Sequence, residues 1–361
     1  MKSPLARKTI REMSGYTPGE QPPAGARVVK LNTNENPFPP SENVMRAIRE
    51  ITPDALRRYP DPLANAFRAA AARVHGVQPE MIIAGNGSDD ILTIATRTFI
   101  PPGGALAFPE PTYSLYPVLA QLQDAKFAVV DWEKNWSLPI DALLATKADA
   151  IYLANPNAPS GTFVPPVKVA ELAEKFAGLL LVDEAYADFA EGNCMSLVSR
   201  FSNVIVSRTM SKAYSLAGLR FGYAVAQEQI IAEMMKVKDS YNCDAISIVA
   251  AAAALEDQEY AAKTWDYVRS ERQRISAELT KLAFAVPPSQ ANFVLATCPD
   301  GDGRHIYQSL KDRGILVRYF DLPGLRDKLR ITIGIKEDND ALLAAIKSIV
   351  DQTQRSPASR K

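Results

Sequence analysis

The sequence predicts an α/β protein in which a mostly parallel, mixed sheet is sandwiched by helices and is followed by a smaller α+β C-terminal domain. Between residues 62 and 226, short apolar runs alternate with amphipathic stretches, which is the pattern of a parallel sheet covered by helices on both faces. After residue 257 the pattern changes to one long helical stretch and then to a mixture of strands and helices. Two differently built units are therefore expected along the chain.

The seven apolar runs of the first unit are expected to be its strands. They lie at Met81–Ala84, Ala105–Phe108, Phe127–Val130, Ala150–Ala154, Leu179–Val182, Val204–Val206 and Phe221–Ala226. Several are separated by stretches with helical periodicity, at Asp89–Phe99, Ser114–Leu122 and Pro166–Phe176. Because ligands of such sheets bind outside the carboxyl ends of the strands, we expect the functional residues just after these runs.

The rest of the chain divides into an arm, a second domain and a tail. An arm over 1–45, rich in proline and glycine, cannot form its own core, so we expect it to lie on the large domain (46–256) or on a partner subunit. The small domain (257–352) is expected to contain helices and strands at Asp257–Lys281, Asn292–Leu295, Arg304–Arg313, Ile315–Val317, Leu329–Ile333 and Asn339–Asp351. Residues 353–361 are expected to be a disordered tail.

Composition argues against several classes of protein. The 361 residues carry 41 basic and 41 acidic side chains, so nothing in the overall charge favours nucleic acid or an anionic membrane as a partner. Three dispersed cysteines and two histidines argue against a disulfide scaffold or a metal site, and fit a reducing compartment. We therefore expect no bound metal. No signal peptide or membrane-spanning run is apparent, so a cytoplasmic protein is expected.

The stretch GNGSDD follows the first predicted strand and opens a helix. Gly87 allows close approach of the backbone, and the N–H groups of Ser88 and Asp89 would point out of the helix N-terminus. Such an arrangement suits a phosphate. The alternative is an ordinary N-cap, in which Ser88 or Asp89 satisfies its own helix.

Two later strand ends carry a carboxylate and a lysine. Asp183 ends a buried strand, where an unpaired carboxylate is costly, so it needs a cation such as a protonated ring nitrogen or a nearby arginine. Lys212, in SRTMSKAYSLAGLR, could act as a nucleophile through a lowered pKa, or extend its amine to solvent as most lysines do. Ser211 and Arg220 would suit the same phosphate as Ser88, or form a surface hydroxyl and an ion pair.

Each of these signals is weak alone, but together they describe one ligand. A phosphate at a helix N-terminus, a carboxylate for a pyridinium nitrogen and a lysine for an aldehyde are the three needs of pyridoxal 5′-phosphate. Metal ions, haem and flavin have no matching need for a lysine. The sequence therefore predicts pyridoxal 5′-phosphate as the cofactor.

Eight ordered stretches, from about residue 16 to 349, carry a resemblance to a known family. They read LNTNENPFPP, RYPDP, GNGSDD, FPEPTYSLY, NPNAPSG, VDEAYADF, SRTMSKAYSLAGLRFGY and GILVRYFDLPGLRDKLRITIG. The chain resembles the pyridoxal-phosphate-dependent transferases of fold type I, and among them the histidinol-phosphate aminotransferases. The most specific stretches are SKAYSLAGLR, DEAY and LRITIG.

The resemblance implies catalytic roles for residues that follow the predicted strands. Lys212 is similar to the lysine that bonds the cofactor and shuttles a proton, and Asp183 to the carboxylate that keeps the pyridine nitrogen protonated. Tyr186 resembles the tyrosine that hydrogen-bonds the phenolic oxygen of the cofactor, and Tyr113 the residue that stacks on its ring. The phosphate would be surrounded by Ser88, Asp89, Thr209, Ser211 and Arg220, beside Gly87.

The resemblance also implies a homodimer with shared active sites, because Tyr59 in RYPDP is similar to a tyrosine that reaches the cofactor phosphate of the neighbouring subunit. One motif departs from the family. Where the usual motif reads Asn-Pro-x-Gly, this chain has Ala158 in place of the asparagine, which normally bonds the phenolic oxygen. Either Asn157 supplies the amide or Tyr186 acts alone, and we favour Asn157 because it belongs to a polar run at a strand end.

The implied reaction transfers an amino group between L-glutamate/2-oxoglutarate and L-histidinol phosphate/imidazole-acetol phosphate. Arg330 resembles the arginine that binds either the carboxylate or the phosphate, since a guanidinium grips both through two parallel bonds. Arg318 is placed to be a second such arginine, and Tyr16 looks like a residue of the substrate pocket. Interdomain ion pairs are the alternative role of both arginines.

Other functions compete with this one. Aromatic amino acid aminotransferases and amino-acid-phosphate decarboxylases share the cofactor motifs, although the paired arginines favour an anionic substrate. A cofactor-sensing regulator would need a DNA-binding domain, for which residues 1–40 are too short. A dehydrogenase is disfavoured because GNGSDD lacks the spacing of the dinucleotide fingerprint.

Overall fold

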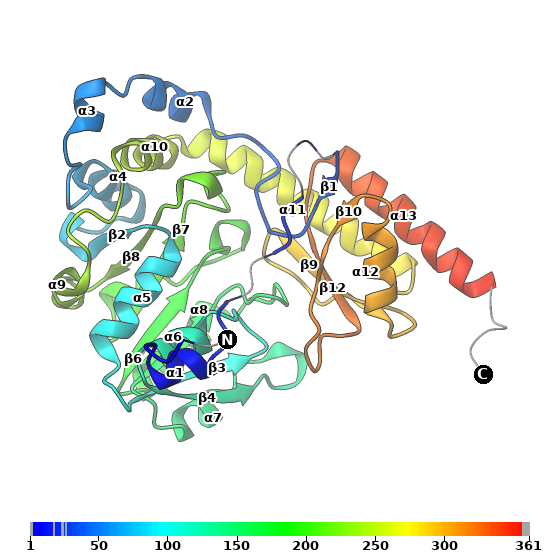
Figure 1. Cartoon of the computed structure of the whole chain (residues 1–361), viewed down its shortest axis with the longest axis horizontal. Helices are drawn as coiled ribbons and strands as arrows, with labels where there is room; N and C mark the ends of the chain where they lie inside the picture. Colours follow the sequence, from blue (N-terminus) through cyan, green and yellow to red (C-terminus); the bar gives the residue numbers. More distant parts are fainter. Residues whose placement is uncertain (1–2, 17–18, 23–24, 26, 356–361) are drawn as a thin grey trace.

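The structure, a computed structural model, describes residues 3–16, 19–22, 25 and 27–355 of the chain. A large α/β part is followed by a smaller part built from the C-terminal third (Figure 1). The long helix α11 (Gln258–Lys281) runs from the first part to the second and packs against α13 (Lys336–Arg355). Helix α10 (Ala245–Glu256) ends at residue 256, where the large domain was predicted to end. We propose this residue as the boundary between the large and the small domain.

The large part is built on a seven-stranded sheet with the order β2-β8-β7-β6-β5-β3-β4. Strand β8 is antiparallel to both of its neighbours and the other pairs are parallel, so the sheet is mixed but mostly parallel, as predicted. Each strand coincides with a predicted apolar run. Their bounds are Ile82–Gly85 (β2), Ala105–Glu110 (β3), Lys126–Asp131 (β4), Ala150–Ala154 (β5), Leu179–Asp183 (β6), Val204–Thr209 (β7) and Gly222–Ala226 (β8).

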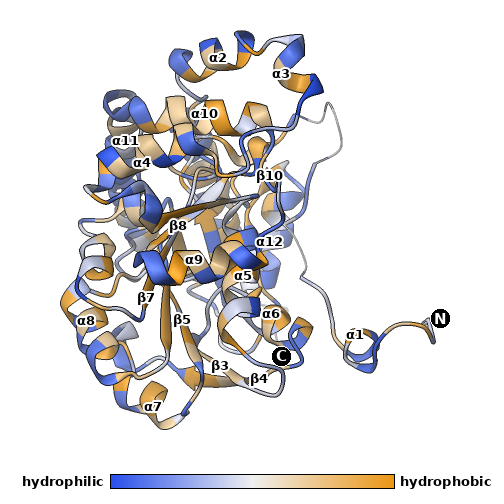
Figure 2. Cartoon of the chain, turned by 90° about the vertical axis from the view of Figure 1, so that its left-hand side faces the viewer, coloured by the Kyte–Doolittle hydropathy of each residue, from blue (hydrophilic) through white to orange (hydrophobic). Residues whose placement is uncertain are grey.

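Helices cover both faces of this sheet because its central strands are apolar on both faces. In β6, Leu180 and Val182 join one buried cluster, whereas Leu179 and Leu181 join the cluster on the other face. The strands are accordingly hydrophobic in Figure 2, and the helices around them carry hydrophilic outer faces. One face is covered by α5 (Ser88–Phe99), α6 (Tyr116–Leu122) and α9 (Glu228–Val237), and the other by α4 (Asn65–His75), α7 (Ile140–Ala145), α8 (Pro166–Lys175) and α10.

The small part contains the antiparallel sheet β11-β12-β9, covered by helices. The predicted strand at Ile315–Val317 is found as β10, which ends one residue earlier and pairs with a strand of the arm, and the chain then enters β11 in another sheet. The bounds are Val29–Lys30 (β1), Phe293–Thr297 (β9), Gly303–Lys311 (α12), Ile315–Leu316 (β10), Arg318–Tyr319 (β11) and Lys328–Thr332 (β12).

The arm lies on its own chain at two places. Strand β1 pairs with β10 of the small part, and the short helix α1 (Lys8–Glu12) lies against the large part, where Thr9 bonds Asp124 with 2.7 Å between oxygens. The arm is thus less extended than predicted, and it continues into α2 (Glu42–Arg49) and α3 (Pro53–Arg57). Helix α13 continues to Arg355, three residues into the predicted tail, and residues 356–361 lie outside the described residues.

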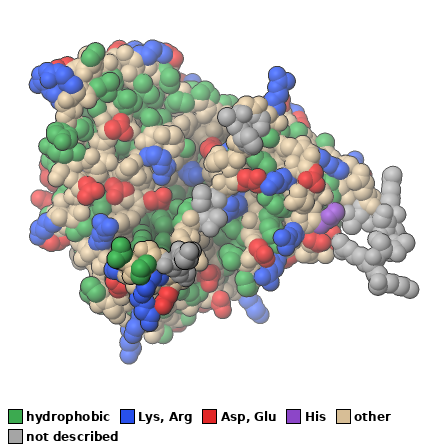
Figure 3. Space-filling view, viewed as in Figure 1, with side chains coloured by type: hydrophobic (Ala, Val, Ile, Leu, Met, Phe, Trp, Pro, Cys, Tyr) green, Lys and Arg blue, Asp and Glu red, His purple; other side chains and the backbone are tan. Residues whose placement is uncertain are grey.

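Charges of both signs are interspersed over the face of the molecule shown in Figure 3. Within the described ranges, no helix is both long and apolar enough to cross a membrane. The same residues contain no group of three or more His, Cys, Asp or Glu side chains that is arranged to hold a metal ion.

Candidate active site

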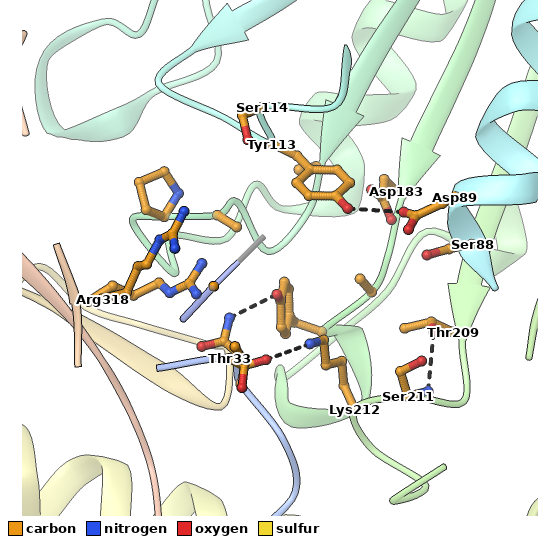
Figure 4. Close-up of a pocket in the computed structure, with 18 of the residues that line it drawn as sticks. Thr33, Ser88, Asp89, Tyr113, Ser114, Asp183, Thr209, Ser211, Lys212 and Arg318 are labelled. Atoms are coloured by element: carbon orange, nitrogen blue, oxygen red, sulfur yellow. Dashed lines mark hydrogen bonds between the residues drawn. The ribbon is translucent and has the colours of Figure 1, made fainter. Parts of the chain in front are cut away.

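A cavity of about 280 Å³ lies at the carboxyl ends of β5, β6 and β7, between the large sheet, the arm and the small part. Twelve of the fifteen predicted site residues line it: Tyr16, Ser88, Asp89, Tyr113, Asp183, Tyr186, Thr209, Ser211, Lys212, Arg220, Arg318 and Arg330. In Figure 4, the predicted phosphate-binding residues lie on one side and Arg318 on the opposite side. The other three, Gly87, Asn157 and Tyr59, lie outside the lining.

The first turn of α5 forms an anion site with the loop after β7. Gly87 has φ +86°, a conformation that favours glycine, and a Cβ there would lie 2.8 Å from Nη2 of Arg220, so a side chain at this position would displace the guanidinium. The Arg220 guanidinium donates to Oγ of Ser211 at 3.2 Å and lies 3.6 Å from the Asp89 carboxylate. A Cβ at Gly222 would collide with the backbone N of Ser88. Two glycines thus let the helix N-terminus approach β8 and Arg220.

Asp183 is a buried carboxylate without a cation. It accepts hydrogen bonds from the hydroxyls of Tyr116 (3.0 Å) and Ser207 (3.4 Å) at the end of β6. Burial nevertheless raises the pKa of Asp183 to about 6, against these hydrogen bonds. Among the described residues, no basic side chain forms an ion pair with it. A cationic ring nitrogen in the cavity would restore its charged form.

Lys212 follows β7 and points into the cavity. Its Nζ donates to the backbone oxygen of Thr33 at 2.8 Å, as Figure 4 shows. Burial lowers the pKa of Lys212 to about 8, helped by the positive charges of Arg330 and Arg220 and opposed by Glu35. A buried amine that loses its proton near neutral pH can act both as a nucleophile and as a proton carrier.

Two tyrosines frame the lysine. The Tyr113 hydroxyl donates to Oδ1 of Asp89 at 3.0 Å, which holds its ring across the cavity (Figure 4). Tyr186 packs edge-on against Phe293, with 5.0 Å between ring centroids, and its hydroxyl accepts a hydrogen bond from Nδ2 of Asn34 at 2.9 Å. These positions agree with a ring-stacking tyrosine and with a hydroxyl facing the cofactor.

The structure does not place Asn157 in the cavity, which corrects our preference for it as the substitute amide. Its Oδ1 accepts from the Thr112 hydroxyl, and its Nδ2 donates to the carbonyl of Pro111 and to Oγ of Ser160. The amide is therefore used inside the protein framework. Ala158 lines the cavity instead, and among the two alternatives only Tyr186 faces the ligand space.

Tyr59 lies outside the cavity of its own chain. Its ring is 79% exposed and stacks on Tyr241, with 4.4 Å between centroids. Its predicted reach into a neighbouring subunit stays a prediction.

The far end of the cavity is formed by two arginines. Arg318 and Arg330 are direct cross-strand partners in β11 and β12, where like charges destabilise a sheet unless an anion lies between them. The guanidinium carbon of Arg330 lies 5.3 Å from the ring centroid of Phe293 and 5.6 Å from that of Phe320. The guanidinium carbon of Arg318 lies 5.3 Å from the same Phe320 centroid. Nη2 of Arg330 donates to the carbonyl of Asn32, but its buried Nε has no partner among the described residues.

Sequence reasoning missed several residues that complete the site. Asn34, Tyr116, Phe320 and Gly222 each contact a predicted residue and were not selected. All four lie inside the stretches that carry the family resemblance, so those motifs could have pointed to them. Asn34 and Phe320 act through contacts that form only when the arm and the small part fold onto the large sheet.

These residues fit pyridoxal 5′-phosphate. The glycine-lined helix N-terminus suits its phosphate, Asp183 is a buried acid that no cation of the described residues pairs with, and Lys212 is a half-buried amine with a lowered pKa. The fold and this site together define an α/β enzyme that binds pyridoxal phosphate.

Comparison with known proteins narrows that class. The family model of the class I and II aminotransferases matches residues 26–346, and the chain belongs to this family. It is 44% identical over 344 residues to histidinol-phosphate aminotransferase 1 of Trichormus variabilis, covering 95% of this chain and 98% of the relative. It is 46% identical over 357 residues to the histidinol-phosphate aminotransferase of Rhodopirellula baltica, covering 98% of each.

A solved structure shares the whole architecture. The histidinol-phosphate aminotransferase of Sinorhizobium meliloti, crystallised in complex with pyridoxal 5′-phosphate, superposes with a TM-score of 0.89 at 28% identity. The match covers 97% of this chain and 99% of the other.

Proposed function

We propose that this chain is a histidinol-phosphate aminotransferase of histidine biosynthesis. It transfers the amino group of L-glutamate to imidazole-acetol phosphate, giving 2-oxoglutarate and L-histidinol phosphate, and the reaction is reversible. The observation that carries the substrate class is the convergence of Arg318 and Arg330 at the end of the cavity opposite the α5 N-terminus. Full-length relatives of the same named activity support the particular substrate.

The residues divide the work of a proton-transfer reaction. When bound, pyridoxal phosphate withdraws electrons from the substrate Cα and so acidifies its C–H bond. Nζ of Lys212 would accept the proton that leaves the substrate Cα and would deliver it to the carbon on the other side of the transferred nitrogen. Asp183 stabilises positive charge on the ring nitrogen, and the α5 N-terminus with Arg220 holds the phosphate so that the ring cannot shift.

The substrate end must accept two different anions in turn. Glutamate brings an α-carboxylate, whereas histidinol phosphate has none and brings a phosphate. Arg330 is half-buried, and its guanidinium contacts the rings of Phe293 and Phe320, which limits its orientation for either oxyanion. Arg318 lies opposite it on the neighbouring strand and adds the second positive charge.

A half-reaction screen tests the assignment. The purified holoenzyme is mixed with one amino donor at a time, and the visible absorbance of the cofactor is followed. We expect rapid bleaching of the band with histidinol phosphate and with glutamate, and slower change with tyrosine, phenylalanine or threonine phosphate. No response to histidinol phosphate would remove this substrate and leave the cofactor assignment intact. Release of carbon dioxide from threonine phosphate would instead indicate a decarboxylase.

We also propose a homodimer with shared active sites, and a cytoplasmic location. The exposed Tyr59–Tyr241 stack lies near further exposed apolar side chains at Leu56 and Leu63, as expected of a surface that another subunit covers.

Mixing two inactive or weakened variants tests the shared site. Lys212→Ala alone should be inactive, and Tyr59→Phe alone should bind the cofactor roughly ten-fold more weakly, the size of one hydrogen bond to a charged group. In a mixed dimer, one site carries both changes and the other carries neither. When the cofactor concentration is too low to saturate the Tyr59→Phe sites, refolding the two variants together should therefore restore activity above either parent. A purely additive mixture, or a monomer in sedimentation, would contradict the shared site.

A further inference from the structure

Asn34 is a buried arm residue whose backbone N–H, backbone carbonyl and side-chain oxygen are all bonded by the small part. Its exposed fraction is 1%, and its backbone φ of 59° lies in the left-handed region. Its N–H donates to Oγ1 of Thr332 at 3.0 Å, and its carbonyl accepts from Nδ2 of Asn292 at 2.9 Å. Its side-chain Oδ1 accepts from the same Thr332 hydroxyl at 3.0 Å.

This network determines which end of the Asn34 amide faces the active site. The Thr332 oxygen already accepts from the Asn34 backbone, so its own hydrogen is available to Oδ1. The other end of the amide is then the NH₂ group, which lies 2.9 Å from Oη of Tyr186. An amide nitrogen only donates, so the Tyr186 oxygen must accept and its own hydrogen remains available for another acceptor.

We propose that Asn34 is a positioning residue that turns the Tyr186 hydroxyl into a hydrogen-bond donor aimed at the phenolic oxygen of the cofactor. The inference rests on the proposed function, because it requires the cofactor between Tyr186 and Asp183. The hydrogen bond from Tyr186 matters more in this chain because the loop residue at the cavity wall is Ala158, which has no amide. The amide of the neighbouring Asn157 is bonded to Pro111 and Ser160. Tyr186 is then the donor to the phenolic oxygen on this side.

The electrostatics of the site keep Tyr186 able to donate. Burial raises the pKa of Tyr186, and this effect exceeds the opposing influences of Arg330 and of the hydrogen bond from Asn34. Asp183 raises this pKa further, as does Tyr16. The phenol therefore stays protonated at neutral pH, and Asn34 fixes where its proton points.

A donor at the phenolic oxygen stabilises the ionised form of that oxygen. It lowers the pH at which the cofactor attached to Lys212 loses its proton, and the visible absorbance of the holoenzyme reports this midpoint. Removing Asn34 releases the Tyr186 hydroxyl to rotate, which weakens the donation. The midpoint should therefore rise.

Two substitutions distinguish the loss of the Asn34 amide donor from a change in the backbone at this position. Asn34→Gly removes the amide while suiting a φ of 59°, and Asn34→Asp keeps the shape but replaces the donor with an acceptor. The midpoint should rise by about one pH unit in the glycine variant, and further in the aspartate variant, which draws the Tyr186 hydrogen towards itself.

The control is a double-mutant cycle with Tyr186→Phe. Once the hydroxyl is gone, Asn34→Gly should leave the midpoint unchanged, because Asn34 acts through that hydroxyl. An unchanged midpoint in both single variants, or an equal shift in the Phe background, would overturn the proposal. Thermal unfolding of each variant confirms that folded protein is compared. The titration contains no substrate, so a wrong substrate assignment would leave it intact, whereas absence of a visible cofactor band would refute the proposed function itself.

Discussion

Replacing Lys212 with alanine is expected to abolish transamination while leaving pyridoxal phosphate bound. The amine is the proton carrier between Cα and the cofactor, and no other buried lysine lines the cavity among the described residues. A positioned proton carrier contributes up to about 10⁴-fold in rate, so we expect turnover to fall by a factor that approaches this value. The anion site and Asp183 do not depend on Lys212 and should still hold the cofactor.

Single-turnover absorbance with glutamate measures this loss, and dialysis followed by phosphate analysis measures the retained cofactor. Lys263→Ala is a matched control, because Lys263 is exposed on α11 and pairs only with Glu259 in its own helix. It should leave the turnover within two-fold of the wild type. Full turnover in the Lys212 variant would defeat the assignment of its role.

The strand ends were the predictable part of this site. A strand buried on both faces must be apolar throughout, so the runs Leu179–Val182 and Val204–Val206 can be recognised as strands from the sequence. The polar residues that follow these runs can then be placed at the strand ends. Asp183 and Lys212 were found in this way, and the parallel arrangement of β6 and β7 brings both strand ends to the same edge.

The orientation of side chains in loops and the long-range contacts could not be predicted. Asn157 and Ala158 are neighbours in one loop, and only the folded loop decides which of them faces the cavity. Asn34 meets Thr332 across 298 residues of sequence, and no local pattern encodes such a contact. The pairing of the predicted strand at Ile315–Val317 has the same cause, because β10 pairs with the distant arm.

Replacing Arg330 with alanine is expected to impair both half-reactions. Arg330 is half-buried, it donates to the Asn32 carbonyl through Nη2, and its buried Nε lacks a partner in the described structure, so the guanidinium has donors left for a substrate anion. Truncating one partner of a desolvated charge pair costs about 2–5 kcal/mol, which is roughly 30- to 5,000-fold in kcat/KM. We expect this loss with glutamate and with histidinol phosphate.

The comparison of the two donors decides whether one cation reads both anions. Arg326→Ala is the matched control, because Arg326 lies on the same part of the chain but is exposed and pairs with Asp321. It should change neither half-reaction. If Arg330→Ala impairs only the reaction of glutamate, the phosphate must be bound elsewhere, and Arg318 is then the first residue to substitute. Equal losses mean that a guanidinium fixed between Phe293 and Phe320 accepts carboxylate and phosphate in one orientation, which lets a single cavity serve both halves of the reaction.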